Sequence, residues 1–193
     1  MTTRSSTRER MLDAAESLMR ERGLSGAGIK DIALRGKAPI GSVYHHFRGG
    51  KTELASLALQ RHGEKAGRLI DSFFVSDASV AERVRALFRN AARGFDQSGA
   101  NKGCAIGAVS LDLGSSDEEL RTICAAAFDH WVQLIAKQLP WRSAAARRSF
   151  AEMVVIAIEG AFVLGRARRS GKPFIIAGEW LAAAADTLAA ETP

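Results

Sequence analysis

The sequence has 193 residues, of which 47% are hydrophobic and 25% are charged, and this balance excludes a generally disordered chain. It contains no uncharged apolar run of the roughly 18 residues that cross a membrane, and its polar opening lacks the apolar core of a signal peptide. The net charge of +6 lies wholly within residues 1–68, because residues 69–193 hold 14 basic and 14 acidic side chains. We therefore expect a cytoplasmic protein without membrane contact, in which a basic N-terminal module meets polyphosphate and a neutral body has another task.

The cysteines and histidines form no pattern typical of a metal site. Cys104 and Cys124 are the two cysteines, and neither is closely spaced with the histidines, which are His45, His46, His62 and His130. Two cysteines would also make a thin disulfide framework. We expect both thiols to be reduced and buried, and we expect neither a bound metal nor a cofactor.

Hydrophobic spacing in the basic part predicts three helices followed by a longer fourth. Ser6 and Glu9 have the spacing of a capping box, and Gly23 stops the helix that they open. Glycine-rich breaks separate the helices that follow, which are expected at 29–35, 39–47 and 51–73.

The neutral body is predicted to be helical throughout, with little strand-like alternation. Ser79 with Glu82, and Ser116 with Glu119, repeat the capping-box spacing at two helix starts. The segment 104–114 is expected to form a short apolar helix. Longer helices are expected after each of the two caps and at 144–170 and 173–190. The predicted fold class is therefore all-α, with about nine helices.

Three short helices with a tight turn between the second and third are the arrangement in which one helix can lie in the major groove of DNA. Gly41 and Ser42 are small enough to approach base edges, and other side chains of this segment can donate hydrogen bonds to phosphates: Tyr44, His45 and Lys51. The core of the module is expected to contain Ile32, Ala33, Val43 and Phe47. The spacing alone also fits an ordinary helical hairpin, and the concentration of positive charge favours the DNA-binding alternative.

One stretch resembles the DNA-binding module of TetR-type transcriptional regulators: Ile32-Ala33 with Ala38 to Leu54, which includes Tyr-His-His-Phe, a glycine turn and a lysine. Four later segments are similar to the LmrA/YxaF-like branch of that family: 103–106, 116–121, 158–161 and 166–173. The resemblance implies a helix-turn-helix domain at 1–50, a linking helix at 51–73, and a ligand-binding and dimerisation domain at 51–193. It implies a homodimeric repressor that a small-molecule effector releases from a palindromic double-stranded DNA operator.

Two alternatives stay open beside a ligand-released repressor. An activator, or a DNA-binding protein that needs no ligand, would carry the same module. An enzyme is the more distant alternative, because the sequence contains no nucleophile elbow, no phosphate-cradling glycine loop and no paired-carboxylate or metal constellation. We expect no catalytic residue.

By the same resemblance, Ile40, Gly41 and Ser42 face the bases, and Tyr44, His45 and Lys51 contact phosphates. The sequence departs from the family pattern at three points. Ala27-Gly28 stands where a threonine commonly caps the second helix, so Gly28 is the expected DNA contact there. Lys37 stands where the turn usually has glycine, which predicts a non-glycine residue in the left-handed conformation. Ile40 replaces a basic or polar residue and could touch a thymine methyl group.

The helix expected at 144–170 is apolar almost all round, which suits packing on its own subunit on one side and on a partner on the other. A wholly intramolecular central helix has the same pattern, and the resemblance favours the dimer. The residues expected at the dimer interface are Ile156, Gly160, Ala161, Leu164 and Trp180.

Aromatic side chains of the body, with a few polar groups among them, could line a pocket for the effector. The candidates are Phe88, Phe95, Asp112, Phe128, Trp131, Glu159 and Phe162, with His130 as a further polar group. For each aromatic residue alone, a place in the ordinary hydrophobic core is the more frequent outcome.

Overall fold

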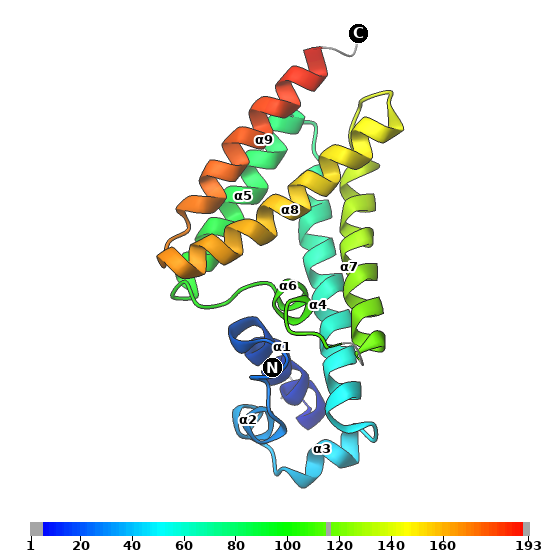
Figure 1. Ribbon diagram of the computed structural model, residues 1–193, viewed down its shortest axis with the longest axis vertical. Coiled ribbons are helices and arrows are strands. Elements are labelled where there is room, and N and C mark those ends of the chain that lie inside the picture. The colour runs from blue at the N-terminus through cyan, green and yellow to red at the C-terminus, as the bar shows by residue number, and fades with distance from the viewer. Residues whose placement is uncertain (1–5, 115–116, 191–193) are drawn as a thin grey trace, which may run out of the picture. The chain divides into compact units, whose positions relative to one another are not determined.

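The computed structural model describes residues 6–114 and 117–190, and within these ranges the only regular secondary structure is helical (Figure 1). Nine helices occupy the described residues: α1 (Thr7–Arg22), α2 (Ile29–Arg35), α3 (Gly41–His46), α4 (Gly50–Phe74), α5 (Val80–Gln97), α6 (Ala105–Ser110), α7 (Glu118–Ala136), α8 (Ala144–Arg168) and α9 (Lys172–Ala190). The prediction of an all-α fold with about nine helices is confirmed.

The ends of the helices follow the capping residues of the sequence. The Ser6 hydroxyl accepts a hydrogen bond from the Glu9 amide at 3.2 Å, and α1 ends at Gly23. At the start of α5 the box is reciprocal, because Ser79 Oγ accepts from the Glu82 amide and the Glu82 carboxylate accepts from the Ser79 amide. Ser116, predicted to cap α7, lies outside the described residues.

The chain divides into two compact units. The first takes the described residues up to Glu64 together with Cys104–Ala127, and the second takes Lys65–Gly103 together with the described residues from Phe128 on. Helices α4 and α7 each contribute to both units, and α6 belongs to the first. These units differ from the predicted domains, whose boundary between residues 50 and 51 rests on function and stays a prediction.

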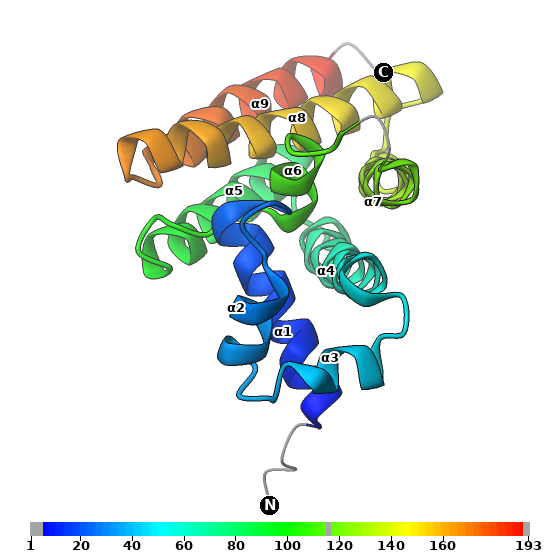
Figure 2. The same cartoon turned by 60° about the horizontal axis from the view of Figure 1, so that its bottom comes forward.

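The core of the first unit forms where α1 packs against α2 and α6 (Figure 2). The apolar face of α1 is buried along its length and consists of Met11, Leu12, Ala14, Ala15, Leu18 and Met19. The four residues predicted for the core of the DNA-binding module are all buried: Ile32, Ala33, Val43 and Phe47. Two helices as short as α2 and α3 therefore depend on this shared core for their positions.

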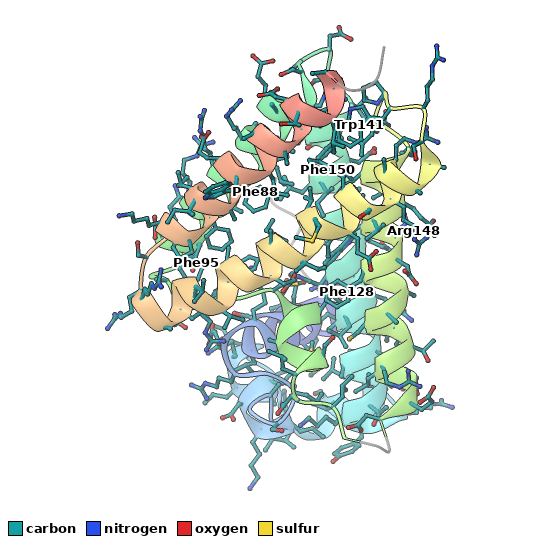
Figure 3. All side chains as sticks on the ribbon, turned by 45° about the horizontal axis from the view of Figure 1, so that its top comes forward. Phe88, Phe95, Phe128, Trp141, Arg148 and Phe150 are labelled. Carbon is teal, nitrogen blue, oxygen red and sulfur yellow. The ribbon has the colours of Figure 1, made fainter. Side chains whose placement is uncertain are left out.

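The second unit is built around the pairing of α5 with α9, with α8 lying against α9 (Figure 1). The two helices come close at Gly178, where a Cβ atom would lie 2.7 Å from the Cβ of the buried Phe88. Near the start of α8, Trp141 and Phe150 stack edge to face with ring centroids 4.9 Å apart (Figure 3). None of the described helices is long and apolar enough to cross a membrane.

Candidate nucleic-acid interface

Helix α3 is anchored on one side and presents the other side to solvent. Val43 and Phe47 are fully buried, whereas Ile40 is 47% exposed and Tyr44 is 57% exposed. Gly41 and His45 are exposed beside them, and Ser42 is half-buried at the edge. A Cβ atom at Gly41 would meet nothing within 4 Å. The structure thus brings the predicted base-facing residues and two of the predicted phosphate contacts together on one open surface.

The turn between α2 and α3 adopts the unusual conformation that the sequence predicts. Lys37 has a φ of 51°, in the left-handed region that glycine normally occupies. The Arg10 side chain of α1 supports this turn, because its Nε donates to the carbonyl oxygen of Gly36 at 3.0 Å and its Nη2 donates to that of Lys37 at 3.5 Å. The predicted left-handed lysine is confirmed.

Gly28 lies at the start of α2 as its N-cap, and it supplies no side-chain hydrogen bond to the first turn. The missing threonine is therefore a real difference in how this helix begins. The Gly28 carbonyl accepts the first helical hydrogen bond, from the Ile32 amide at 2.9 Å, as in other helices, and no side chain caps the first turn. A DNA contact at Gly28 stays a prediction, and only its backbone could make it.

Lys51, at the start of α4, is partly engaged within the protein. Its Nζ donates to the carbonyl oxygen of Leu24, in the loop between α1 and α2, at 2.7 Å. An ammonium group has three donors, so two are left for another acceptor such as a phosphate. Gly50 precedes it with a φ of 65°, and a Cβ there would lie 3.7 Å from the Tyr44 ring. The start of α4 and the exposed tyrosine of α3 are thus neighbours.

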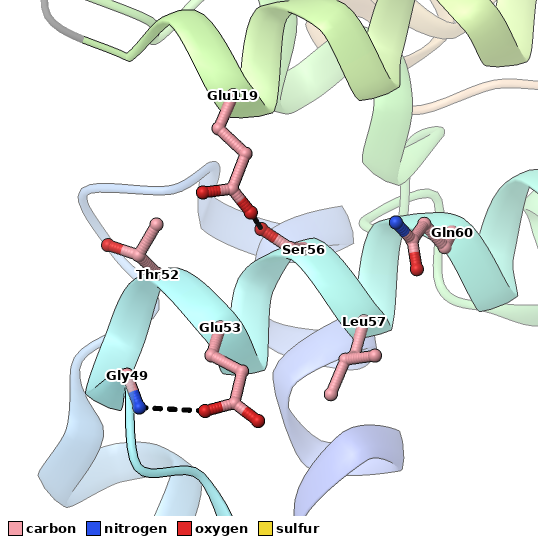
Figure 4. A pocket seen from close by; sticks show the side chains of 7 residues that line it. All are labelled: Gly49, Thr52, Glu53, Ser56, Leu57, Gln60 and Glu119. Atoms are coloured by element: carbon pink, nitrogen blue, oxygen red, sulfur yellow. Dashed lines mark hydrogen bonds between the residues drawn. The ribbon is translucent and has the colours of Figure 1, made fainter.

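A groove of about 310 Å³ runs beside the first turns of α4 (Figure 4). Five of its seven lining residues have polar side chains, and the lining consists of Gly49, Thr52, Glu53, Ser56, Leu57, Gln60 and Glu119. Two short hydrogen bonds cross it, from the Ser56 hydroxyl to Glu119 and from the Gly49 amide to Glu53, both at 2.7 Å. Because carboxylates repel phosphates, this groove is unsuited to DNA, and the open surface of α3 is the better candidate. Nowhere in the described residues are three or more His, Cys, Asp or Glu side chains grouped to hold a metal ion.

Basic side chains that the motif did not single out also surround α3. Lys37 and Arg48 are exposed at its two ends, and the Arg8 guanidinium lies 5.4 Å from the centroid of the Phe47 ring. Their charge could have been counted from the sequence, but their closeness to α3 depends on how α1 and the two turns pack.

A cluster of charged residues joins α4 to α1. The Arg61 guanidinium contacts three carboxylates of α1, those of Glu9 at 2.9 Å, Asp13 at 2.5 Å and Glu16 at 3.5 Å. The neighbouring His62 has its Nδ1 atom 3.2 Å from Glu16. Sequence reasoning missed this cluster, because acidic residues four apart on a helix are equally common on a solvated face.

The predicted pocket residues fall into separate groups. In the second unit, Phe95 of α5 and Phe162 of α8 form one aromatic cluster with Phe174 of α9, with ring centroids 4.9–6.1 Å apart. Phe128 and Trp131 of α7 form another, with centroids 5.4 Å apart. Phe88 is buried on α5, Glu159 is half-buried on α8 and His130 is exposed on α7. Their role as a pocket stays a prediction, and Phe174 was not among the predicted residues.

Asp112 belongs to the first unit, whereas those aromatic residues belong to the second, and it follows α6 in the chain. Its carboxylate accepts a hydrogen bond from the Ser25 amide at 2.6 Å. The pKa of Asp112 is lowered, first by this hydrogen bond and next by one from the Ser25 side chain, with smaller contributions from the Leu24 backbone and the charge of Lys51. The contact that the structure gives this residue is therefore with the α1–α2 loop.

Four of the five residues predicted at the dimer interface lie on the surface of α8 and α9. Ile156 is 56% exposed, Trp180 is 77% exposed, and Gly160 and Leu164 are exposed between them in sequence. Ala161 differs, because it is 3% exposed and packs within its own subunit. One residue along a helix turns the side chain by about 100°, which places Gly160 and Ala161 on different sides of α8, and the interface itself stays a prediction.

Comparison with known proteins gives the family. The family model for bacterial regulatory proteins of the tetR family matches residues 11–57, and that for the C-terminal domain of LmrA/YxaF-like transcriptional regulators matches residues 80–180. The chain belongs to the TetR family. It is therefore a DNA-binding transcriptional regulator with an LmrA/YxaF-like C-terminal domain, and the relatives are regulators rather than enzymes.

Three similar proteins illustrate this membership of the TetR family. The HTH-type transcriptional regulator YxaF of Bacillus subtilis is 28% identical over 181 residues, which cover 93% of this chain and 95% of that protein. The crystal structure of a regulatory protein TetR from Rhodobacter sphaeroides has a TM-score of 0.83 at 21% identity, over 92% of this chain and 98% of the other. The regulator CifR, in a structure with a 26-base-pair operator DNA, has a TM-score of 0.80 at 20% identity, over 94% and 98%.

Proposed function

We propose that this TetR-family regulator is a homodimeric repressor that reads a palindromic operator with α3 and is released from it by a small apolar effector. The observation that carries the proposal is the open surface of α3, formed by small and apolar residues at its start and by Tyr44 and His45 further along. A helix that fits the major groove needs small residues at its closest approach and donors at the flanks, and this surface has both.

The apolar Ile40 sharpens the expectation for the operator. Its side chain is 47% exposed although it could have been buried, and an apolar group in the major groove gains most from a thymine methyl group. We therefore expect at least one A·T pair in each half-site where Ile40 enters. Substitution by Arg should move the preference at that pair toward guanine.

The reading role of α3 is tested with a duplex selected from a random DNA pool by the wild-type protein. Tyr44→Ala should weaken binding to this duplex at least about 10-fold, because a hydrogen bond to a charged group is worth roughly 1.5–3 kcal/mol. Fluorescence anisotropy measures the affinity, and the exposed Gln133→Ala on α7 serves as the control. Undiminished binding by Tyr44→Ala would refute the assignment of α3.

The dimer is supported by the exposed apolar residues of α8 and α9. On α8, Ile156, Gly160 and Leu164 recur every fourth residue and so share one side of the helix. On α9, Ile176 and Trp180 repeat the same spacing. Large exposed apolar side chains around a small residue are typical of helix-to-helix interfaces, and a two-fold pair would supply two reading helices for two half-sites.

Sedimentation velocity tests the dimer directly. Trp180→Glu should shift the protein from dimer to monomer, because a charge buried without a partner strongly opposes association. Val75→Glu places the same charge on another exposed apolar residue, outside α8 and α9, and should leave the dimer intact. A dimer that survives both substitutions would contradict this interface.

Repression and release need a functional measurement. With the selected operator placed before a reporter gene, the wild-type protein should lower expression and Tyr44→Ala should not. A rise in expression would instead identify an activator.

The effector is expected to contact the cluster of Phe95, Phe162 and Phe174. Phe162→Ala should therefore change the concentration of an active apolar compound that is needed to release the operator. The affinity for the operator without that compound should stay unchanged. A panel of apolar compounds that releases nothing would contradict the effector proposal.

A further inference from the structure

The loop between α1 and α2 is held from two directions by residues distant in sequence. Asp112, which follows α6, accepts from the Ser25 amide at 2.6 Å, and Lys51 of α4 donates to the Leu24 carbonyl at 2.7 Å. The Ser25 amide of the loop thus donates to a carboxylate, and the Leu24 carbonyl of the loop accepts from an ammonium group. We call Asp112, Ser25, Leu24 and Lys51 the loop clasp.

The shape of the loop matches the carboxylate. Gly23, which ends α1, has a φ of 72°, and a Cβ atom there would lie 2.9 Å from Asp112 Oδ2. A side chain at this position would meet both a strained backbone and the carboxylate oxygen. The close approach of Asp112 to the loop therefore fits a glycine at position 23, because a larger residue there would have to displace the carboxylate.

The loop is connected to α3 through α2. It leads through Ala27, which is buried, to Gly28, the N-cap of α2. Helix α2 shares its buried core with α3 through Ile32 and Val43. Helix α2 has only seven residues; α1 holds its last turn through the Arg35–Glu21 ion pair at 2.7 Å, and the loop leads into its first turn. A displacement of the loop would therefore shift α2 and, with it, α3.

We propose that Asp112 is a positioning residue for operator binding, which holds the α1–α2 loop and thereby sets the placement of α3. The proposal rests on the reading role proposed for α3. Asp112 lies within residues 80–180, matched by the family's C-terminal domain, whereas Ser25 and Lys51 lie within residues 11–57, matched by its DNA-binding domain. The loop clasp is thus a direct bond between the segments of the two family domains.

Electrostatics and positioning predict opposite results when Asp112 loses its charge. Removal of a negative charge from a DNA-binding module strengthens binding to every DNA sequence, because phosphate repulsion falls. Loss of a positioning contact weakens binding to the operator and leaves binding to unrelated DNA unchanged, since the latter needs no exact placement of α3. The ratio of operator to unrelated-DNA affinity therefore separates the two.

The experiment measures binding of full-length Asp112→Ala and Asp112→Asn to the selected operator and to a random duplex by fluorescence anisotropy. Asp112→Ala should lose operator affinity about 5-fold or more, within the usual range of coupling between sites, whereas its affinity for the random duplex should stay the same or rise slightly because a negative charge is removed. Asp112→Asn keeps an oxygen that can accept from the Ser25 amide, so it should lose less. Glu118→Gln removes an exposed charge elsewhere in the same unit and should keep the wild-type ratio.

Equal or tighter operator binding by Asp112→Ala would overturn the proposal, and so would a parallel loss on both duplexes. Because the Asp112 side chain is at the surface, both variants should fold, and circular dichroism at the assay temperature checks this. Tyr44→Ala is measured alongside. If Tyr44→Ala binds normally, the reading role of α3 fails; if it loses binding while Asp112→Ala does not, only the role of Asp112 fails.

Discussion

Both units have apolar cores, but charged and polar side chains also join distant segments of the first unit, whereas aromatic rings cluster between the helices of the second. In the first, Arg61, Asp112 and Arg10 each connect helices or turns far apart in sequence. In the second, Phe174 and Trp141 stand in edge-to-face or tilted clusters. Hydrogen bonds fix direction and distance narrowly, while apolar contacts tolerate rearrangement. The difference would suit the reading role proposed for α3 and the effector site proposed for the second unit.

The largest effect is expected from removing a ring in the second unit. Phe174→Ala deletes a fully buried side chain that contacts Phe95 and Phe162, and it should lower the free energy of unfolding by about 3–5 kcal/mol. Urea unfolding followed by circular dichroism measures the loss. Ile175→Ala, at the exposed neighbouring position, should lower it much less. Equal losses would mean that the aromatic cluster is not what stabilises this unit.

A smaller loss is expected when the polar cluster of the first unit is cut. Arg61, whose side chain is 20% exposed, bridges three carboxylates of α1, so Arg61→Ala should lower the free energy of unfolding by about 1–3 kcal/mol. Arg121→Ala removes the same charge from a pair on α7 whose side chains are 62% and 67% exposed, and its effect should stay below about 1 kcal/mol. If the two substitutions have equal effects in urea unfolding, the polar cluster contributes no more than an ordinary surface pair.

Strain in the turn between α2 and α3 predicts a gain in stability together with a loss of DNA binding. Lys37→Gly relieves a left-handed residue, which should raise the free energy of unfolding by up to about 1 kcal/mol. It also removes an exposed cation next to α3. The slope of the logarithm of operator affinity against the logarithm of salt concentration should therefore become shallower by about one. Ala100→Gly relieves a similar φ of 56° in the second unit and should leave DNA binding unchanged. An unaltered salt dependence for Lys37→Gly would place Lys37 away from the phosphates.

The smallest effect is expected on how far the melting temperature falls in acid, through an ion pair of the second unit. A hydrogen bond from Arg85 lowers the pKa of Glu179 below its ordinary value of 4.5. A carboxyl group whose pKa is lower in the folded than in the unfolded protein stabilises the fold at any pH above its ordinary pKa. This stabilisation is lost as the pH falls to the pKa of the folded state. Glu179→Gln should therefore reduce the fall in melting temperature between pH 5 and pH 3 (about these values) relative to the wild type. Glu152→Gln, an exposed change on α8, should not reduce it, and identical pH profiles for all three proteins would rule out this link.

Local chemistry made most of the fold predictable from the sequence. Ser79 and Glu82 are three residues apart, so the cap that they form at α5 needs no knowledge of the rest of the chain. The left-handed Lys37 followed from the resemblance to the family's turn, which usually has glycine at this position, and the burial of Val43 followed from its expected place in the core of the module. Each of these inferences uses residues within one or two turns of helix.

What could not be predicted depends on contacts between distant segments. Asp112 and Ser25 are 87 positions apart, and nothing near either one indicates the other. Phe174 joins Phe95 and Phe162 only because α9 lies along α5. Ala161 is apolar like its exposed neighbours, and a helix that is apolar all round gives no sign of which side faces inward.

Tyr44 is the single tyrosine of the chain, and it is 57% exposed on α3. Biosynthetic incorporation of 3-fluorotyrosine would therefore place one fluorine atom on the surface assigned to DNA, with no background from elsewhere in the molecule. Its resonance would report directly on whether an operator, an unrelated duplex or an effector changes the surroundings of that ring. The sequence thus carries its own spectroscopic probe at the position where the regulator is expected to meet its target.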